Sequence, residues 1–192
     1  MRFDLRIVTS LIEPGSRVLD LGCGTGDLLS TLREGKGVEG RGIEIDGKEV
    51  IACVEKGLSV LQGDMHEETR DLADGSFDYV ILSQTLQESR RPLEVLREML
   101  RIGKHAVVAF PNYGHWAVRL SLLATGRAPR TKCFPHEWYN SPNIHFLTIR
   151  DFEKLVREQG WTVERKIFLA GHRTGVFLAN LIAEVAVYQV RK

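Results

Sequence analysis

The chain has 192 residues, 43% hydrophobic and 27% charged, with a formal net charge of +1. This composition is that of a globular protein with a sizeable core, and the near-zero charge gives no general attraction to nucleic acid or anionic membranes. Three isolated cysteines, no signal peptide and no long apolar run predict a cytoplasmic protein without membrane association, rather than a secreted, disulfide-bonded or membrane-spanning one.

The first half of the chain alternates predicted helices and strands. In order, the pattern predicts a helix over 3–12, a strand over 17–21, a helix to about Arg33, a strand over 40–46, a helix with Val50, Ile51 and Val54 on one face, a short strand over 58–62 and a strand over 77–83. The last of these is a nearly continuous apolar run, which is typical of a buried parallel strand.

The second half continues the alternation after one irregular segment. Pro92 opens a helix with Leu93, Leu96, Met99 and Leu100 inward, a strand follows over 105–110, a helix lies near 116–124, Thr148 caps a helix that ends at Gly160, and strands over 161–169 and 183–190 form an antiparallel pair at the sheet edge. We therefore predict one doubly wound, Rossmann-like α/β domain over residues 1–192, with a mostly parallel seven-stranded sheet and a lid or docking insertion at about 112–148.

The turn after the first strand is the strongest local signal. Asp20 lies in the apolar strand, and glycine then recurs at Gly22, Gly24 and Gly26 before a predicted helix. Glycine permits positive φ and removes the Cβ, so a ligand can lie directly on the backbone, Cys23 included. We expect a nucleotide-like ligand at this strand end, because alternating glycines weaken a fold that has no such use for them.

The sequence around the turn limits which class of ligand can bind there. Neither register of the glycines completes Gly-x-Gly-x-x-Gly/Ala, and no Lys-Ser/Thr follows them, which excludes a dinucleotide fingerprint and a P-loop. Asp20 and Asp27 would repel a pyrophosphate and suit a ligand with a positive charge. S-adenosylmethionine carries an ammonium that Asp20 could attract and a carboxylate that the amides of the turn and helix start could face.

Candidate binding residues follow the next strands. Glu44 lies where a strand-end acid binds ribose hydroxyls, with Ile45 beside it and Asp46 as a weaker alternative. Asp64 and Met65 would contact the adenine, although Asp64 is equally well explained as a helix cap. Ser83 and Gln84 leave the fourth strand towards the reactive end of the ligand. These residues complete the predicted cofactor site.

The catalytic machinery is harder to find. Thr85 and Gln87 follow the fourth strand where a base is wanted, and neither side chain is a useful base at neutral pH. His136-Glu137 begins like a zinc motif, but Asn140 stands where the second histidine belongs, so we predict no metal. His136 or His145 could act as a base, although hydrogen bonding within the loop is the simpler interpretation. The catalytic residues stay unknown.

Residues 112–148 concentrate aromatic and basic side chains. They include Trp116, Trp138, Arg119, Arg127 and Arg130. Such residues carry most of the binding energy at protein interfaces. A lid or a protein-docking surface is favoured over nucleic-acid binding, because the positive charge is confined to a short run of a neutral chain.

Two resemblances join these observations. The sequence VLDLGCGTG resembles motif I of the class I S-adenosylmethionine-dependent methyltransferases, and the blocks SQTLQ (83–87), FPNYGHW (110–116) and WYNSPNIH (138–145) resemble the MetW family of methionine-biosynthesis proteins over essentially the whole chain. That resemblance implies S-adenosylmethionine (or S-adenosylhomocysteine) binding and support of a partner, the homoserine O-acyltransferase MetX. The alternative is an active methyltransferase acting on a small molecule, with RNA modification a distant third.

Overall fold

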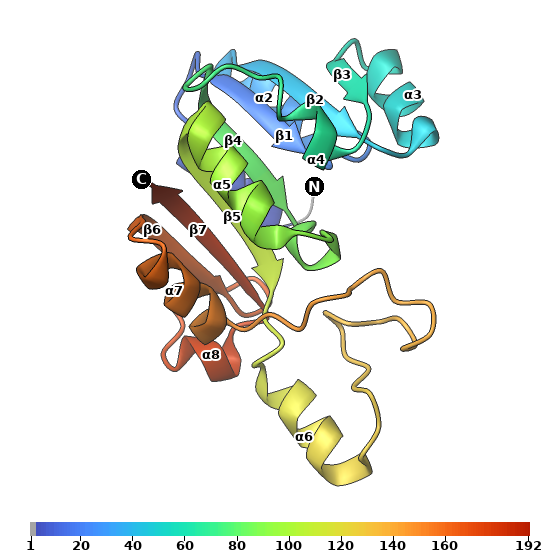
Figure 1. The fold of residues 1–192 in the computed structure, drawn as a ribbon. Coiled ribbons are helices and arrows are strands. Elements are labelled where there is room, and N and C mark those ends of the chain that lie inside the picture. The colour runs from blue at the N-terminus through green and yellow to red at the C-terminus, as the bar shows by residue number, and fades with distance from the viewer. Residues whose placement is uncertain (1–2) are drawn as a thin grey trace.

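The computed structural model describes residues 3–192 and contains one seven-stranded sheet (Figure 1). The strands are β1 (Arg17–Leu21), β2 (Glu39–Glu44), β3 (Ser59–Gln62), β4 (Phe77–Ser83), β5 (Gly103–Pro111), β6 (Thr162–Leu169) and β7 (Val185–Arg191). The helices are α1 (Phe3–Leu11), α2 (Asp27–Lys36), α3 (Gly47–Glu55), α4 (Met65–Glu68), α5 (Pro92–Ile102), α6 (Trp116–Thr125), α7 (Ile149–Glu158) and α8 (Ala179–Ile182), with a 3₁₀ turn η1 (Leu86–Glu88).

The sheet order is β3-β2-β1-β4-β5-β7-β6, which confirms the predicted α/β class. The first five strands are parallel, with Asp20 of β1 opposite Gly42 on one side and Ile81 on the other. β7 runs antiparallel to both β5 and β6. The predicted antiparallel pair is therefore present, and the reversed strand β7 lies one position in from the edge strand β6.

Two apolar cores cover the two faces of the sheet. One packs α5 and α7 on the strands and contains the rings of Phe110, Phe152 and Tyr188, whose centroids lie 4.7–6.0 Å apart. The other packs α1 and α2 on the opposite face. The inward face predicted for α5 is buried, except that Leu93 is half-buried. Both faces of the central strands β1, β4 and β5 are thus covered, as their apolar runs require.

The apolar face predicted for α3 does not enter the core. Ile51 and Val54 are 60% and 61% exposed, and Cys53 is the buried residue of this helix. The reason is the position of α3 at the β3 end of the sheet, where it contacts the sheet through Cys53. The spacing of the apolar residues was helical, but it did not indicate which side of the helix packs.

The segment between β5 and α7 contains one helix that extends away from the sheet. α6 stands clear of the strands in Figure 1, and Val118 is the one fully buried residue within it. Thr148 caps α7, donating to and accepting from Asp151 in a complete capping box, as predicted. No helix within residues 3–192 is both long enough and apolar enough to cross a membrane.

A comparison of Gly26 and Gly37 tests how tightly the glycine turn is packed. Both have positive φ, 75° and 62°, but a Cβ on Gly26 would overlap Leu58 and lie 2.9 Å from Cys53 Sγ, while a Cβ on Gly37 meets nothing within 4 Å. We expect Gly37→Ala to cost about 1 kcal/mol of unfolding free energy and Gly26→Ala about 1–3 kcal/mol more. Urea unfolding measures both; equal losses would show that the turn has room for a side chain.

Candidate functional site

The site lies where the strand order reverses between β1 and β4. In open α/β sheets the crevice at the carboxyl ends of two such strands is the ligand site. The glycine turn follows β1, and Gln84 follows β4 with a left-handed φ of 63°. The Gln84 amide donates to Ala109 O at 2.7 Å, which fixes this strained residue against β5. A non-glycine residue in this conformation is uncommon and is often found at functional sites.

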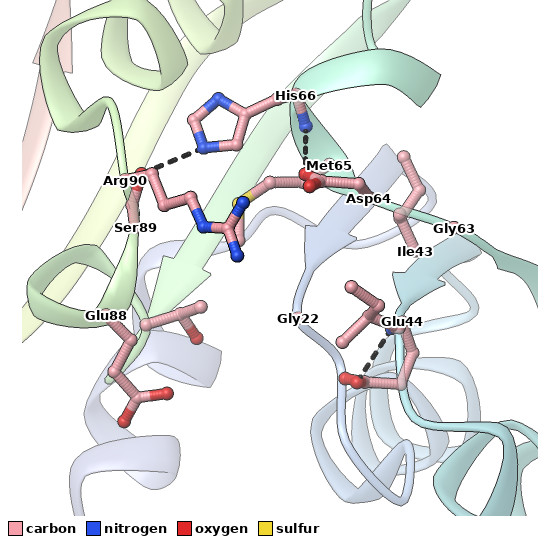
Figure 2. Close-up of a pocket in the computed structure, with 12 residues that line it drawn as sticks. Gly22, Ile43, Glu44, Gly63, Asp64, Met65, His66, Glu88, Ser89 and Arg90 are labelled. Carbon is pink, nitrogen blue, oxygen red and sulfur yellow. Dashed lines mark hydrogen bonds between the residues drawn. The ribbon is translucent and has the colours of Figure 1, made fainter. Parts of the chain in front are cut away.

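A cavity of about 520 Å³ opens on one side of the glycine turn (Figure 2). The predicted residues among its lining are Gly22, Glu44, Ile45, Asp64 and Met65. Figure 2 shows that Glu44 comes from the β2 side, while Glu88, Ser89 and Arg90 come from the segment after β4. The volume is typical of a small-molecule site. The structure therefore brings together the residues predicted to bind ribose and adenine.

Glu44 holds the two sides of the turn together. Its Oε2 accepts the Gly24 amide at 2.8 Å, and its Oε1 accepts the amides of Ile45 and Asp46 at 2.8 and 3.0 Å. A carboxylate offers about four lone-pair sites, so one is left for a ligand hydroxyl. Asp46, the weaker alternative, instead caps α3 by accepting the Lys48 amide.

The far wall of this cavity is built by α4 and the segment after β4. Asp64 Oδ1 accepts the His66 amide at 2.9 Å, so the helix-cap role of Asp64 is confirmed. The His66 ring lies 3.2 Å from the Ser89 hydroxyl, which joins α4 to residues 84–91. Both His66 and Arg90 line the cavity. The cap occupies one oxygen of Asp64, and the other is left to face the cavity.

A second cavity of about 400 Å³ lies on the other side of the turn. Its lining includes the remaining predicted residues Asp20, Cys23, Gly24, Ser83 and Gln84. Gly22 and Thr85 line both cavities, so the two meet over the turn.

Two polar atoms beside this second cavity are buried without a partner. They are Ser83 Oγ and Glu49 Oε2, neither of which has a hydrogen-bond partner within the described residues. Buried polar atoms are nearly always paired, so orphans at a cavity indicate a ligand with complementary groups. Two acceptor oxygens beside buried Asp20 fit the donors of an ammonium group.

Most amides of the glycine turn already donate to protein acceptors, chiefly at the end of β2, contrary to our expectation that they face a ligand. Gly22 and Cys23 donate to Ile43 O, Gly24 donates to Glu44, and Gly26 donates to Cys23 O. A ligand carboxylate is left with the first amides of α2, which have no partner within that helix. Gly26 lines neither of these two cavities; it is the N-cap residue of α2 and packs on Cys53.

The Cys23 side chain is not available as a nucleophile. Burial, with the nearby Asp20 charge, raises the pKa of the Cys23 thiol far above its usual range. Its Sγ lies 3.9 Å from Cys53 Sγ, and burial raises the pKa of that thiol as well. Because thiolates are the reactive form, both groups act as small apolar side chains under the turn.

Sequence reasoning missed Glu88, which stands one residue beyond the block SQTLQ. Glu88 is exposed and lines the first cavity; partial desolvation there raises its pKa, the His136 charge opposes this, and the Glu44 charge adds to it. Its position after β4 is the signal that could have found it. His145 approaches the same region, since its amide donates to Gln87 O, but its Nε2 is buried and has no hydrogen-bond partner among residues 3–192.

The comparisons with known proteins agree with this geometry. The sheet and the turn are those of the class I S-adenosylmethionine-dependent methyltransferase fold. Crystal structures of such methyltransferases match from Archaeoglobus fulgidus (TM-score 0.72, 19% identity, 98% of this chain and 91% of that one) and Thermotoga maritima (TM-score 0.69, 20% identity, 98% and 87%). Residues 2–190 match the family described as methionine biosynthesis protein MetW, and the chain belongs to that family.

Two curated relatives add detail. The "Bifunctional methionine biosynthesis protein MetXA/MetW" of Rhodopirellula baltica is 33% identical over 177 residues, which are 88% of this chain and 28% of that protein. A demethylmenaquinone methyltransferase of Bacillus cereus is 31% identical over 102 residues, 48% of this chain and 42% of that enzyme. The chain thus spans less than half the length of these relatives. The predicted family resemblance is confirmed.

We expect Glu44→Gln to weaken S-adenosylmethionine binding by about 1–3 kcal/mol, because a charged acceptor for hydroxyl and amide donors is lost. That corresponds to about 5- to 150-fold in the calorimetric Kd. Asp46→Asn is the matched control, since it makes the same change two residues away at a helix cap. Unchanged affinity in Glu44→Gln would place the ligand elsewhere.

The raised pKa of Glu88 predicts a pH-dependent stability difference. A carboxyl whose folded pKa lies above its unfolded value destabilises the fold once both states are ionised, and costs nothing below the unfolded pKa, about 4.3. Because Glu88 is exposed and solvent screens its charge, Glu88→Gln should raise the ligand-free melting temperature by at most about 1 °C at neutral pH and leave it unchanged below about pH 4. Glu55→Gln, on α3 and outside both cavities, should show no such trend. A Glu88→Gln gain that grows on acidification would contradict the assignment.

Proposed function

We propose that this protein binds S-adenosylmethionine and supports a homoserine O-acyltransferase, MetX, as a partner in methionine biosynthesis. The proposal of S-adenosylmethionine binding rests on the pair of cavities that meet over Gly22. Their combined lining supplies an acid for the ribose, an acid and a thioether for the adenine, and acceptors for an ammonium group.

The residues present fit each part of that ligand. Glu44 retains capacity for a ribose hydroxyl, and Asp64 with Met65 faces the adenine. Asp20 and the orphaned oxygens of Glu49 and Ser83 suit the ammonium. The first amides of α2 face the carboxylate. Glu49 was not predicted from the sequence. It lies on α3, which follows β2, and it reaches the end of β4 only because β2 and β4 lie on either side of β1 in the sheet.

The proposed partnership with the acyltransferase is supported by the MetXA/MetW relative. Its name joins the two functions on one polypeptide, of which this chain corresponds to 28%. A fusion holds its modules at high effective concentration, which favours even a weak association between them. We infer that the separate chains associate in the same functional unit.

A second candidate function is methyl transfer to a small molecule. Glu88 favours it, because a carboxylate of raised pKa that lines the ligand cavity has the properties of a general base. The two functions differ in their products. A methyltransferase releases S-adenosylhomocysteine in the presence of its acceptor, while a supporting partner changes the rate of another enzyme.

The deciding experiment is reconstitution with the purified acyltransferase. We expect this chain to raise the rate of homoserine acylation in a saturable manner, and S-adenosylmethionine to change either that rate or the affinity of the complex, since coupling requires different affinities with and without ligand. Glu44→Gln, which we expect to weaken S-adenosylmethionine binding, should need more ligand to produce the same response.

Two results would contradict these proposals. An acylation rate that is indifferent to this chain would overturn the partner function. S-adenosylhomocysteine release that depends on a cellular extract and is lost in Glu88→Gln would instead establish the methyltransferase.

A further inference from the structure

α6 carries an exposed apolar stripe that the fold itself does not use. Trp116, Leu120 and Leu123 stand at positions i, i+4 and i+7, so they lie along one face of the helix. They are 50%, 53% and 85% exposed. A helix that is apolar on its outer side is ordinarily buried against something. Here it stands clear of the sheet in Figure 1.

The N-terminal part of α6 is anchored to the rest of the fold, so the stripe has a fixed position. Arg119 donates from Nε to Gly114 O at 2.6 Å and reaches Asn180 O in the α8 region. Val118 is buried, and the ring of Tyr113 packs on Phe134 and Phe146 with centroids 4.9 and 4.6 Å apart. A preorganised helix loses little conformational entropy on binding.

Basic residues follow the stripe in the sequence. Within 112–148 there are four lysines and arginines against one acid, Glu137, which pairs with Arg130 at 2.7 Å. Arg127 and Lys132 are exposed and have no acidic partner within the described residues. The complementary surface is therefore an apolar groove with an acidic rim, and an amphipathic helix laid into a groove is a common recognition mode.

This charge pattern argues against a second copy of the chain. A two-fold dimer places the same patch on both subunits, so the basic residues of both copies would share one interface. Like charges across an interface are costly. The occupant is a different protein, and the MetXA/MetW relative identifies one that shares a chain with this family.

We infer that the α6 stripe is the surface on which the homoserine O-acyltransferase docks, with Trp116, Leu120 and Leu123 in an apolar groove of that enzyme and Arg127 and Lys132 against its acidic rim. This inference rests on the proposed partner function and assigns its interface. Trp is among the residues that most often dominate interface energy.

The test compares two double variants of the full chain with the purified acyltransferase. Leu120→Glu/Leu123→Glu adds two acids to the stripe, while Ile51→Glu/Val54→Glu makes the same charge change at the exposed face of α3. We expect the first to weaken the complex by at least about 100-fold and to abolish stimulation of acylation, and the second to leave both unchanged. Both should keep the melting temperature and S-adenosylmethionine affinity of the wild type.

A charge-reversal variant provides an independent readout. Arg127→Glu/Lys132→Glu should slow association by about 10-fold at low salt and flatten the dependence of the association rate on ionic strength. The inference is overturned if Leu120→Glu/Leu123→Glu binds and stimulates as the wild type does, or if sedimentation shows a wild-type dimer that this variant dissociates. A wild-type chain that neither binds nor stimulates the acyltransferase would instead defeat the proposed function itself.

Discussion

The bond from the Gly24 amide to the Glu44 carboxylate is the contact on which the rest of the site depends. It joins the turn after β1 to the end of β2, and the same carboxylate orders the next two amides of the chain. A buried acid with three donors is strongly fixed in place. It fixes the turn between the two cavities, so that one ligand lying over the turn can contact acidic residues in both.

The features that could be predicted from the sequence are those set by neighbouring residues. β1 and β4 begin and end where predicted, because an apolar run bounded by turn residues is a local signal. The glycine turn, the cap at Thr148 and the strand-end acids are local in the same way. All the predicted strand-end candidates except Gly26 line one of the two cavities.

What could not be predicted depends on contacts between distant segments. The spacing of Ile51 and Val54 could not reveal that α3 packs through Cys53, because that follows from the place of β3 in the sheet order. Glu49 and Glu88 belong to the site only because β2 and β4 flank β1. The donation of the turn amides to β2 likewise appears only once Ile43 and Glu44 lie opposite the turn.

The position of β7 between β5 and β6 has a consequence for how the molecule is made. Within the described residues β6 pairs with β7 alone, and α1 packs on β7 as well. During synthesis, residues 162–169 therefore have no strand to join until residues 185–191 have left the ribosome. The helix α1 likewise lacks part of its packing surface until β7 has been synthesised. The parallel strands β1 to β5 can pair before β7 is made. A chain that ends before β7 would lose β6 from the sheet as well, because β6 has no other strand to pair with among the described residues.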